Sequence, residues 1–192
     1  MIDTFNDFCK QVKIMKEYDV IVVGAGTGGS VTAAALAYKG YKVALLDRHQ
    51  KEKVGVKVCG DATSTFHFDQ IQSVVPIEPP NEKNGEVRQR IKGAILISPD
   101  RKTKLKMVDE DSTGVIIDRF KMGMRLLNTA IGYGVDFFDN AMVKRPIVEN
   151  DFVVGVQYRD VRTNETKELR AKVVVDASGI SAVLRTKLDP NK

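Results

Sequence analysis

Residues 18–47 read YDVIVVGAGTGGSVTAAALAYKGYKVALLD and contain the pattern that decides the fold. The apolar run at 20–23 is followed by a glycine-rich turn at 24–29, and the alanine-rich segment after it predicts a helix. A second apolar run at 43–46 ends at the carboxylate of Asp47. Strand, glycine turn, helix, strand and acid follow one another in the order of a dinucleotide-binding βαβ unit.

Each glycine position of the turn has a physical role in such a unit. Gly24 permits the tight turn out of the strand, and Gly26 lets the backbone approach a pyrophosphate. Gly29 lets the helix pack close to the sheet. The first helical turn, which begins with Thr27 and Gly28, directs N–H groups and the positive end of the helix dipole at the phosphates.

Asp47 follows Gly29 by 18 residues, close to the spacing of about 20 expected for an acid that accepts hydrogen bonds from the adenosine ribose. Asp47 and its neighbour Arg48 are therefore predicted cofactor-binding residues.

Composition indicates a globular chain without a metal centre. The 192 residues are 43% hydrophobic and 29% charged, and the net charge is +5, which suits one soluble domain. Basic residues alternate with acids, which argues against a nucleic-acid interface. Two cysteines and two histidines form neither a disulfide framework nor a metal-ligand motif. We expect a cytoplasmic protein, because no apolar run reaches the ~20 residues of a membrane span and charges interrupt the N-terminus.

The chain divides into an N-terminal extension, residues 1–16, and an α/β domain over 17–192 with an inserted helix and hairpin region at about 54–118. The fold class is Rossmann-like: a parallel sheet with its βαβ unit, followed by a β-meander. Further expected elements are helices at 64–75 and 119–133, strands at 91–98, 104–108 and 135–138, meander strands at 142–148, 151–158 and 168–171, and a buried strand at 172–176.

Four features occur in the order seen in the geranylgeranyl reductase family, which the chain resembles from Tyr18 to about Leu188. They are the βαβ unit with its acid, the segment KVCGDA at 57–62, the helix headed by Arg119 and the segment VVVDASG at 173–179. These flavoproteins are FAD-dependent oxidoreductases that saturate isoprenoid double bonds in archaeal membrane lipids and related pathways. The resemblance implies FAD as the cofactor, lipid biosynthesis as the setting and a prenyl lipid as the substrate.

The resemblance also implies roles for individual residues. Cys59, Gly60 and Ala62 would run past the flavin half of FAD, with Cys59 the candidate catalytic residue. Arg119 would contact FAD, and Val143 would lie against the adenine. Each has a structural alternative: Cys59 as an inert buried thiol, Arg119 as the ion-pair partner of Asp118 or Asp136, and Val143 as core packing.

Two departures from the family bear on partners. Ser178 stands where related hydroxylases carry an acid associated with pyridine-nucleotide use, so the electron donor stays open between ferredoxin, NADPH and others. The family also continues beyond this length into a substrate-binding domain. We therefore expect the chain to be a fragment, half of a split protein or a truncated product, and to need a complementing C-terminal chain. Contact with a membrane is expected to be peripheral at most.

Two other functions remain open at this point. Asp47 would equally suit the 2′-hydroxyl of NAD in an NAD(P)-dependent dehydrogenase, although the expected meander is unusual in such domains. A non-catalytic nucleotide-binding subunit that works with a partner chain is the third possibility. An absorbance spectrum of the purified protein separates the three.

Overall fold

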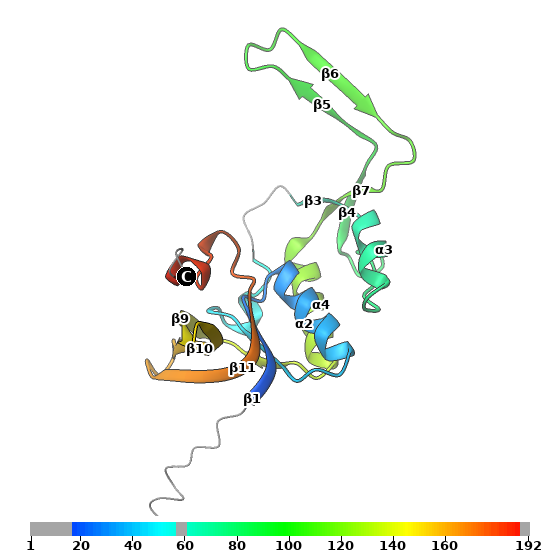
Figure 1. The fold of residues 1–192 in the computed structure, drawn as a ribbon. Helices are drawn as coiled ribbons and strands as arrows, with labels where there is room; N and C mark the ends of the chain where they lie inside the picture. Colours follow the sequence, from blue (N-terminus) through cyan, green and yellow to red (C-terminus); the bar gives the residue numbers. More distant parts are fainter. Residues whose placement is uncertain (1–16, 57–60, 189–192) are drawn as a thin grey trace, which may run out of the picture.

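A computed structural model describes residues 17–56 and 61–188, so the predicted extension at 1–16 lies outside the described residues. The centre is a six-stranded sheet in the order β8-β2-β1-β11-β10-β9 (Figure 1). Its strands are β1 (Glu17–Val23), β2 (Val43–Leu46), β8 (Asp136–Phe138), β9 (Ala141–Glu149), β10 (Phe152–Asp160) and β11 (Thr166–Asp176). The strands β8, β2, β1 and β11 run parallel, whereas β10 and β9 are antiparallel to their neighbours.

Strands β1 and β2 are covered on both faces, which explains their continuous apolar sequences. Val20 and Val22 of β1 belong to one core layer, and Ile21 and Val23 belong to the other. Strand β2 alternates in the same way, and all four of its residues are buried. These strands therefore form the rigid middle of the molecule.

Helices α2 (Thr27–Tyr38) and α4 (Arg119–Gly132) pack against each other and supply the first core layer. Small side chains let α2 lie close, and Ala33 and Ala34 are fully buried. Helix α4 is amphipathic and buries Leu126 and Leu127. Its start is fixed by Asp118, whose Oδ1 accepts a hydrogen bond of 3.0 Å from the backbone N–H of Lys121, a normal N-cap contact.

The β9–β10 meander supplies the second core layer, on the other face of the parallel strands. The structure differs here from the sequence prediction, because 168–171 and 172–176 belong to one strand. The first half of β11 pairs with β10 and its second half with β1. The expected burial of its end is also wrong in part, since Val173 is 52% exposed.

The inserted region follows β2 and returns at α4. It contains the 3₁₀ turn Lys51–Lys53, β3 (Ala62–Ser64), α3 (Phe66–Gln72), β4 (Val87–Ile91), β5 (Gly93–Ile97), β6 (Lys104–Val108) and β7 (Gly114–Ile117). Strands β3, β7 and β4 form a small antiparallel sheet, and β5 and β6 form a separate hairpin. Helix α3 is shorter than the predicted 64–75, and the predicted strand at 91–98 is divided at Lys92 between β4 and β5.

A buried ion pair attaches this region to α4. Glu86 is only 2% exposed, and its Oε1 accepts a hydrogen bond of 2.6 Å from Nε of Arg125. The backbone carbonyl of Glu86 also accepts the N–H of Asp118 at 2.6 Å. The base of the inserted region is therefore fixed to the start and the middle of α4.

The end of β11 is organised by a single carboxylate, Asp176. Its Oδ1 accepts from the hydroxyl and the backbone N–H of Ser178, and its Oδ2 accepts from the N–H groups of Leu184 and Arg185. Partial burial raises the pKa of the Asp176 carboxyl, but these hydrogen bonds outweigh burial and hold the pKa below its ordinary value, since they favour the charged form. The loop at 178–185 is thereby folded back onto the strand.

We predict that Asp176→Asn destabilises the protein at neutral pH and that the difference from the parent disappears in acid. A carboxyl whose pKa is lowered by folding stabilises the folded state above its unfolded pKa, near 4, and loses that contribution as the pH falls towards the folded pKa. The measurement is the free energy of unfolding between pH 7 and pH 3 for both proteins. Asp69→Asn, which changes an exposed carboxylate on α3, is the matched control, and an Asp176 effect that stayed constant with pH would contradict the assignment.

Candidate cofactor-binding site

A cavity of about 820 Å³ lies where the carboxyl ends of β1, β2 and β11 meet. Val23, Leu46 and Asp176, the last residues of these strands, all line it. Ligands of open α/β sheets bind at this edge. Eight of the predicted site residues line the cavity: Gly24, Gly26, Thr27, Gly28, Asp47, Arg48, Arg119 and Val143.

The glycine turn is held in a space too tight for side chains. Gly24 has a φ of +100°, and a Cβ there would lie 2.6 Å from the carbonyl oxygen of Ala177 on the neighbouring segment. A Cβ on Gly29 would lie 1.8 Å from the carbonyl oxygen of Gly24. Gly29 therefore does not line the cavity itself but allows α2 to start directly against the turn, as predicted from its position.

The N-terminus of α2 faces the cavity with its donors available. Gly26 is the N-cap residue, and among the described residues no side chain caps this helix end and no acid lies in its first turn. Thr27 and Gly28 line the cavity. Unsatisfied N–H groups and the helix dipole make such an end suitable for a phosphate or pyrophosphate, so the residues present fit the predicted pyrophosphate position.

Asp47 is buried at the end of β2 and bonded to the turn. Its Oδ2 accepts the backbone N–H of Ala25 at 2.8 Å, and its Oδ1 accepts from the backbone N–H of His49 at 2.9 Å and lies 2.8 Å from Nδ1 of the same residue. A carboxylate offers about four acceptor positions, so these contacts leave capacity for about one further donor. Asp47 therefore fits a ribose hydroxyl with its orientation already fixed.

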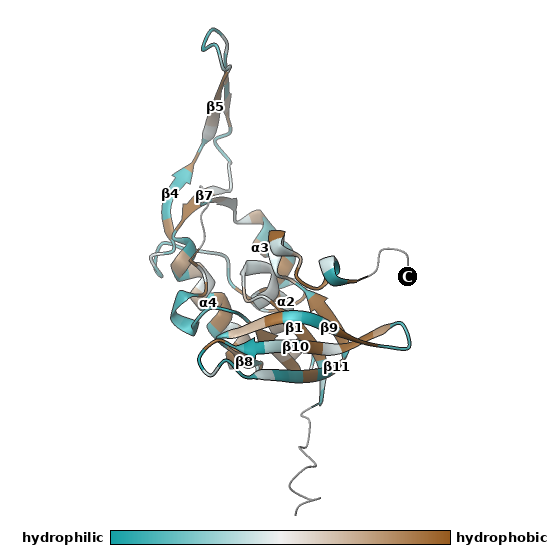
Figure 2. Ribbon diagram, turned by 90° about the vertical axis from the view of Figure 1, so that its left-hand side faces the viewer, coloured by the Kyte–Doolittle hydropathy of each residue, from teal (hydrophilic) through white to brown (hydrophobic). Residues whose placement is uncertain are grey.

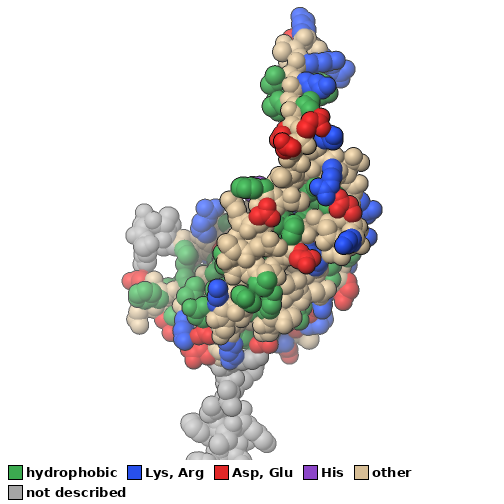
Figure 3. Space-filling model, turned by 90° about the vertical axis from the view of Figure 1, so that its right-hand side faces the viewer, with side chains coloured by type: hydrophobic (Ala, Val, Ile, Leu, Met, Phe, Trp, Pro, Cys, Tyr) green, Lys and Arg blue, Asp and Glu red, His purple; other side chains and the backbone are tan. Residues whose placement is uncertain are grey.

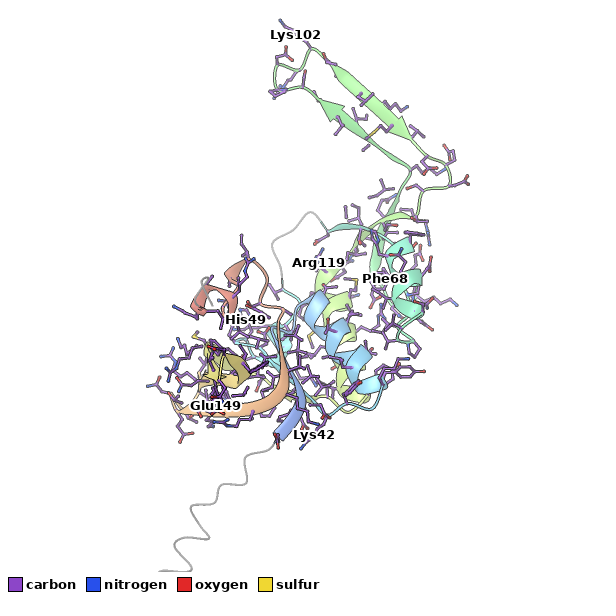
Figure 4. The ribbon with its side chains drawn as sticks, in the orientation of Figure 1. Lys42, His49, Phe68, Lys102, Arg119 and Glu149 are labelled. Atoms are coloured by element: carbon purple, nitrogen blue, oxygen red, sulfur yellow. The ribbon has the colours of Figure 1, made fainter. Side chains whose placement is uncertain are left out.

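His49 is a site residue that the sequence did not indicate. It lines the cavity beside Arg48, and a carboxylate partner means that Nδ1 carries the hydrogen in the contact with Asp47. Figure 4 shows His49 on the segment after β2 and Arg119 at the start of α4. The signal was weak because a histidine two residues beyond a strand belongs to no recognisable motif.

Arg119 lines the cavity and is held by an acid other than those expected. Its Nε lies 3.4 Å from Oδ1 of Asp61, whereas the sequence suggested Asp118 or Asp136 as alternatives. Cys59 and Gly60, two further predicted residues, lie outside the described part of the chain. Ala62 is exposed at the start of β3 and does not line the cavity.

Two other walls complete the site. Val143 is 9% exposed and belongs to the second core layer while it also lines the cavity, so its packing role and its predicted place beside the adenine are compatible. The loop at 178–183, which Asp176 holds in place, forms the opposite part of the lining. The sequence had offered only Ser178 from this loop as a point of interest.

No candidate metal site and no helix long and apolar enough to cross a membrane occur among the residues that the structure describes.

Comparison with known proteins agrees with this geometry. Residues 17–191 match the family described as the FAD binding domain. A digeranylgeranylglycerophospholipid reductase of Sulfolobus acidocaldarius is 36% identical over 178 residues, which cover 92% of this chain and 37% of that protein. A protein of the same name from Methanococcoides burtonii is 30% identical and is matched over 86% of this chain and 38% of its own length. The chain thus spans somewhat more than a third of these relatives.

Solved structures show the same fold. A geranylgeranyl bacteriochlorophyll reductase-like protein of Thermoplasma acidophilum superposes with a TM-score of 0.72 at 26% identity, over 88% of this chain and 43% of that protein. A myxobacterial FAD-dependent halogenase superposes with a TM-score of 0.75 at 22% identity, over 90% of this chain and 40% of that protein. The second likeness concerns the fold alone.

These findings confirm the predicted α/β fold, the predicted resemblance to geranylgeranyl reductases and the predicted cofactor, FAD. The match covers every described residue, and it shows that the chain belongs to the FAD binding domain family, in agreement with the uncapped helix end and the fixed carboxylate at the cavity.

Proposed function

We propose that this chain is the FAD-binding part of an oxidoreductase that reduces isoprenoid C=C bonds of lipids. The observation that carries the proposal is the cavity at the strand ends, which collects the glycine turn, Asp47 and Arg119 in a chain 36% identical to a digeranylgeranylglycerophospholipid reductase. Fold likeness alone would not choose a reaction, because FAD-dependent halogenases share the fold.

The proposed assignment of the cofactor follows the cavity from one end to the other. The pyrophosphate would lie at Gly26 and the start of α2, with the adenosine ribose on Asp47 and the adenine against Val143. Arg119 would face the flavin half. The helix end supplies N–H donors for the phosphate charge, and the buried surroundings strengthen each polar contact because the local dielectric is low.

Bound and reduced, FAD would supply a hydride to one alkene carbon while an acid supplies a proton to the other. The contribution of this chain is to place the cofactor and to exclude water from it. Asp61 would hold Arg119 in position through their ion pair. We further propose that polypeptide outside the matched region supplies the prenyl-lipid channel, as a complementing chain or continuation, and that contact with the membrane is peripheral.

Cys59 is proposed to lie beside the flavin. The support is its distance along the chain: Asp61, two residues later, lies against Arg119, which lines the cavity, and two residues span at most about 7 Å. Access to a cofactor rather than burial in the core would make the thiol reactive.

We predict that Gly26→Val abolishes FAD binding without unfolding the chain. Gly26 has a φ of −66°, which valine can adopt without backbone strain. We expect the loss because the added side-chain atoms would occupy the proposed phosphate position. Flavin fluorescence titration measures the affinity. Gly132→Val is the matched control, since a Cβ at Gly132 meets no atom within 4 Å. Unchanged FAD affinity in Gly26→Val would contradict the assignment of the pyrophosphate to the glycine turn.

We predict that FAD slows alkylation of Cys59. Iodoacetamide labelling followed by peptide mass spectrometry measures the rate at each cysteine with and without FAD. Cys9, the other cysteine of the chain, serves as an internal control whose rate should not change. Equal labelling of Cys59 under both conditions would favour the inert-thiol alternative.

The proposed function is tested by an anaerobic assay with FAD, dithionite and a geranylgeranyl lipid. We expect no saturated product from the 192-residue chain alone. We expect product when the remainder of the Sulfolobus acidocaldarius reductase is present, and none when the chain carries Gly26→Val. Saturated product from the chain alone would contradict the need for a complementing part. Absence of saturated product from a mixture that holds FAD would contradict the function itself.

A further inference from the structure

The β5–β6 hairpin projects from the body of the molecule, and among the described residues neither of its strands pairs with a strand outside it (Figure 1). All ten residues of its two strands are exposed. Six of them are large apolar residues between 47% and 60% exposed: Ile95, Leu96, Ile97, Leu105, Met107 and Val108. A two-stranded hairpin is only marginally stable by itself, and apolar surface of this kind marks an interaction site.

The pairing register divides the hairpin into two different faces. Ala94 is opposite Met107, and Leu96 is opposite Leu105, so one face is wholly apolar because directly paired residues share a side. We call this the apolar face. On the other side Ile95 is opposite Lys106, and Ile97 is opposite Lys104; this is the lysine face.

Charge along the hairpin is also ordered. Asp109, Glu110 and Asp111 follow β6 at the base, where Lys92 lies 2.7 Å from Glu110. Farther out the charges are cationic except for Asp100 in the turn, whose carboxylate accepts from the hydroxyl of Ser98. Figure 3 shows lysine and arginine side chains along the projection and acids near its base.

Four outer cations, Arg101, Lys102, Lys104 and Lys106, form no ion pair with any residue in the described ranges. Two of them lie in the turn, where Figure 4 marks Lys102 at the tip, and the other two lie in β6. The outer hairpin therefore complements a partner that carries acids.

A lipid bilayer does not suit this element. Within the described residues β5 and β6 pair only with each other, so the outer edge of each strand has unpaired backbone groups. Such edges do not occur in the hydrocarbon of a membrane, since each unsatisfied group is costly there. Figure 2 also shows a hydrophilic tip beyond a more hydrophobic shaft, the reverse of an inserting loop. A polypeptide strand, by contrast, satisfies an open edge.

We propose that the outer edge of β6 receives an extended strand from polypeptide that, in the curated reductases, lies outside the region matched by this chain. The strand carries acidic residues opposite Lys104 and Lys106 and apolar residues opposite Leu105 and Met107. These relatives have more than half of their length outside the match, which supplies the occupant. The inference rests on the proposed function, because it takes that polypeptide as the counterpart of the FAD-binding part.

Lysines on β6 give this edge its selectivity. A charged edge strand rejects indiscriminate pairing, whereas opposite charges directly across a strand pair stabilise it. Strand β5 carries no charge, so β6 is the edge on which charge complementarity selects the partner.

The test uses the full 192-residue chain, co-expressed with the remainder of the Sulfolobus acidocaldarius reductase as a separate tagged chain. The decisive variant is Lys104→Glu with Lys106→Glu, and its matched control is Arg101→Glu with Lys102→Glu, which makes the same change of charge in the turn. We expect the Lys104/Lys106 variant to weaken association at least about tenfold and the turn variant less than about threefold. Backbone amides at 104–108 should exchange hydrogen more slowly in the complex.

The proposal would be overturned if both variants weakened association equally or if the parent chain did not associate at all. It would also be overturned if the remainder were recovered only as aggregate with every variant. Vesicles of phosphatidylglycerol and phosphatidylcholine form the second arm. Vesicle binding by the parent that both variants reduce equally would assign the hairpin to an anionic lipid surface. FAD absorbance is recorded throughout, so a complex that forms without flavin contradicts the proposed function, whereas a flavin-binding chain that fails to associate contradicts only this inference.

Discussion

One residue, Asp47, connects the parts of the fold on which the site depends. Its side chain accepts the N–H of Ala25 in the glycine turn, its backbone N–H donates to Phe138, and its carbonyl accepts from Ala141. The start of α2, the strand β8 and the meander are thus all held at the end of β2. Because β2 is buried on both faces, this junction cannot shift without breaking the core. A carboxylate held this way would bind the proposed ribose at little entropic cost.

The second constraint is steric and concerns three pieces of backbone. The turn after β1, the start of α2 and Ala177 after β11 approach so closely that Gly24 and Gly29 have no room for a Cβ. This closeness places the free N–H groups of the helix at the mouth of the cavity, and the Asp176 loop closes its other side. The glycines that the fold requires therefore also shape the proposed anion site, so one sequence motif indicates both.

That coincidence explains how much could be read from the sequence. Residues 18–47 predicted their elements correctly, because strands buried on both faces have continuous apolar runs and tight turns need glycine. Long-range partners left no local trace. The burial of Glu86 depends on Arg125, far along the chain, and the single strand β11 was split in the prediction because its two halves have different neighbours. In α3 Phe68 is buried whereas Phe66, two residues earlier, is 53% exposed, and this difference is set by tertiary packing.

The two regions of the molecule differ in how they are held, and they are physically connected. The end of the cavity at the glycine turn is fixed by buried strands and by Asp47. The other end depends on Arg119, the first residue of α4 and two residues after β7, and on Asp61, directly before β3. Strand β7 pairs with β4, and β4 and β7 lead into β5 and out of β6. A ribbon of backbone therefore runs from the exposed hairpin to the residue pair at the cavity, and the contacts of Glu86 with Arg125 and Asp118 fix the base of that ribbon to α4.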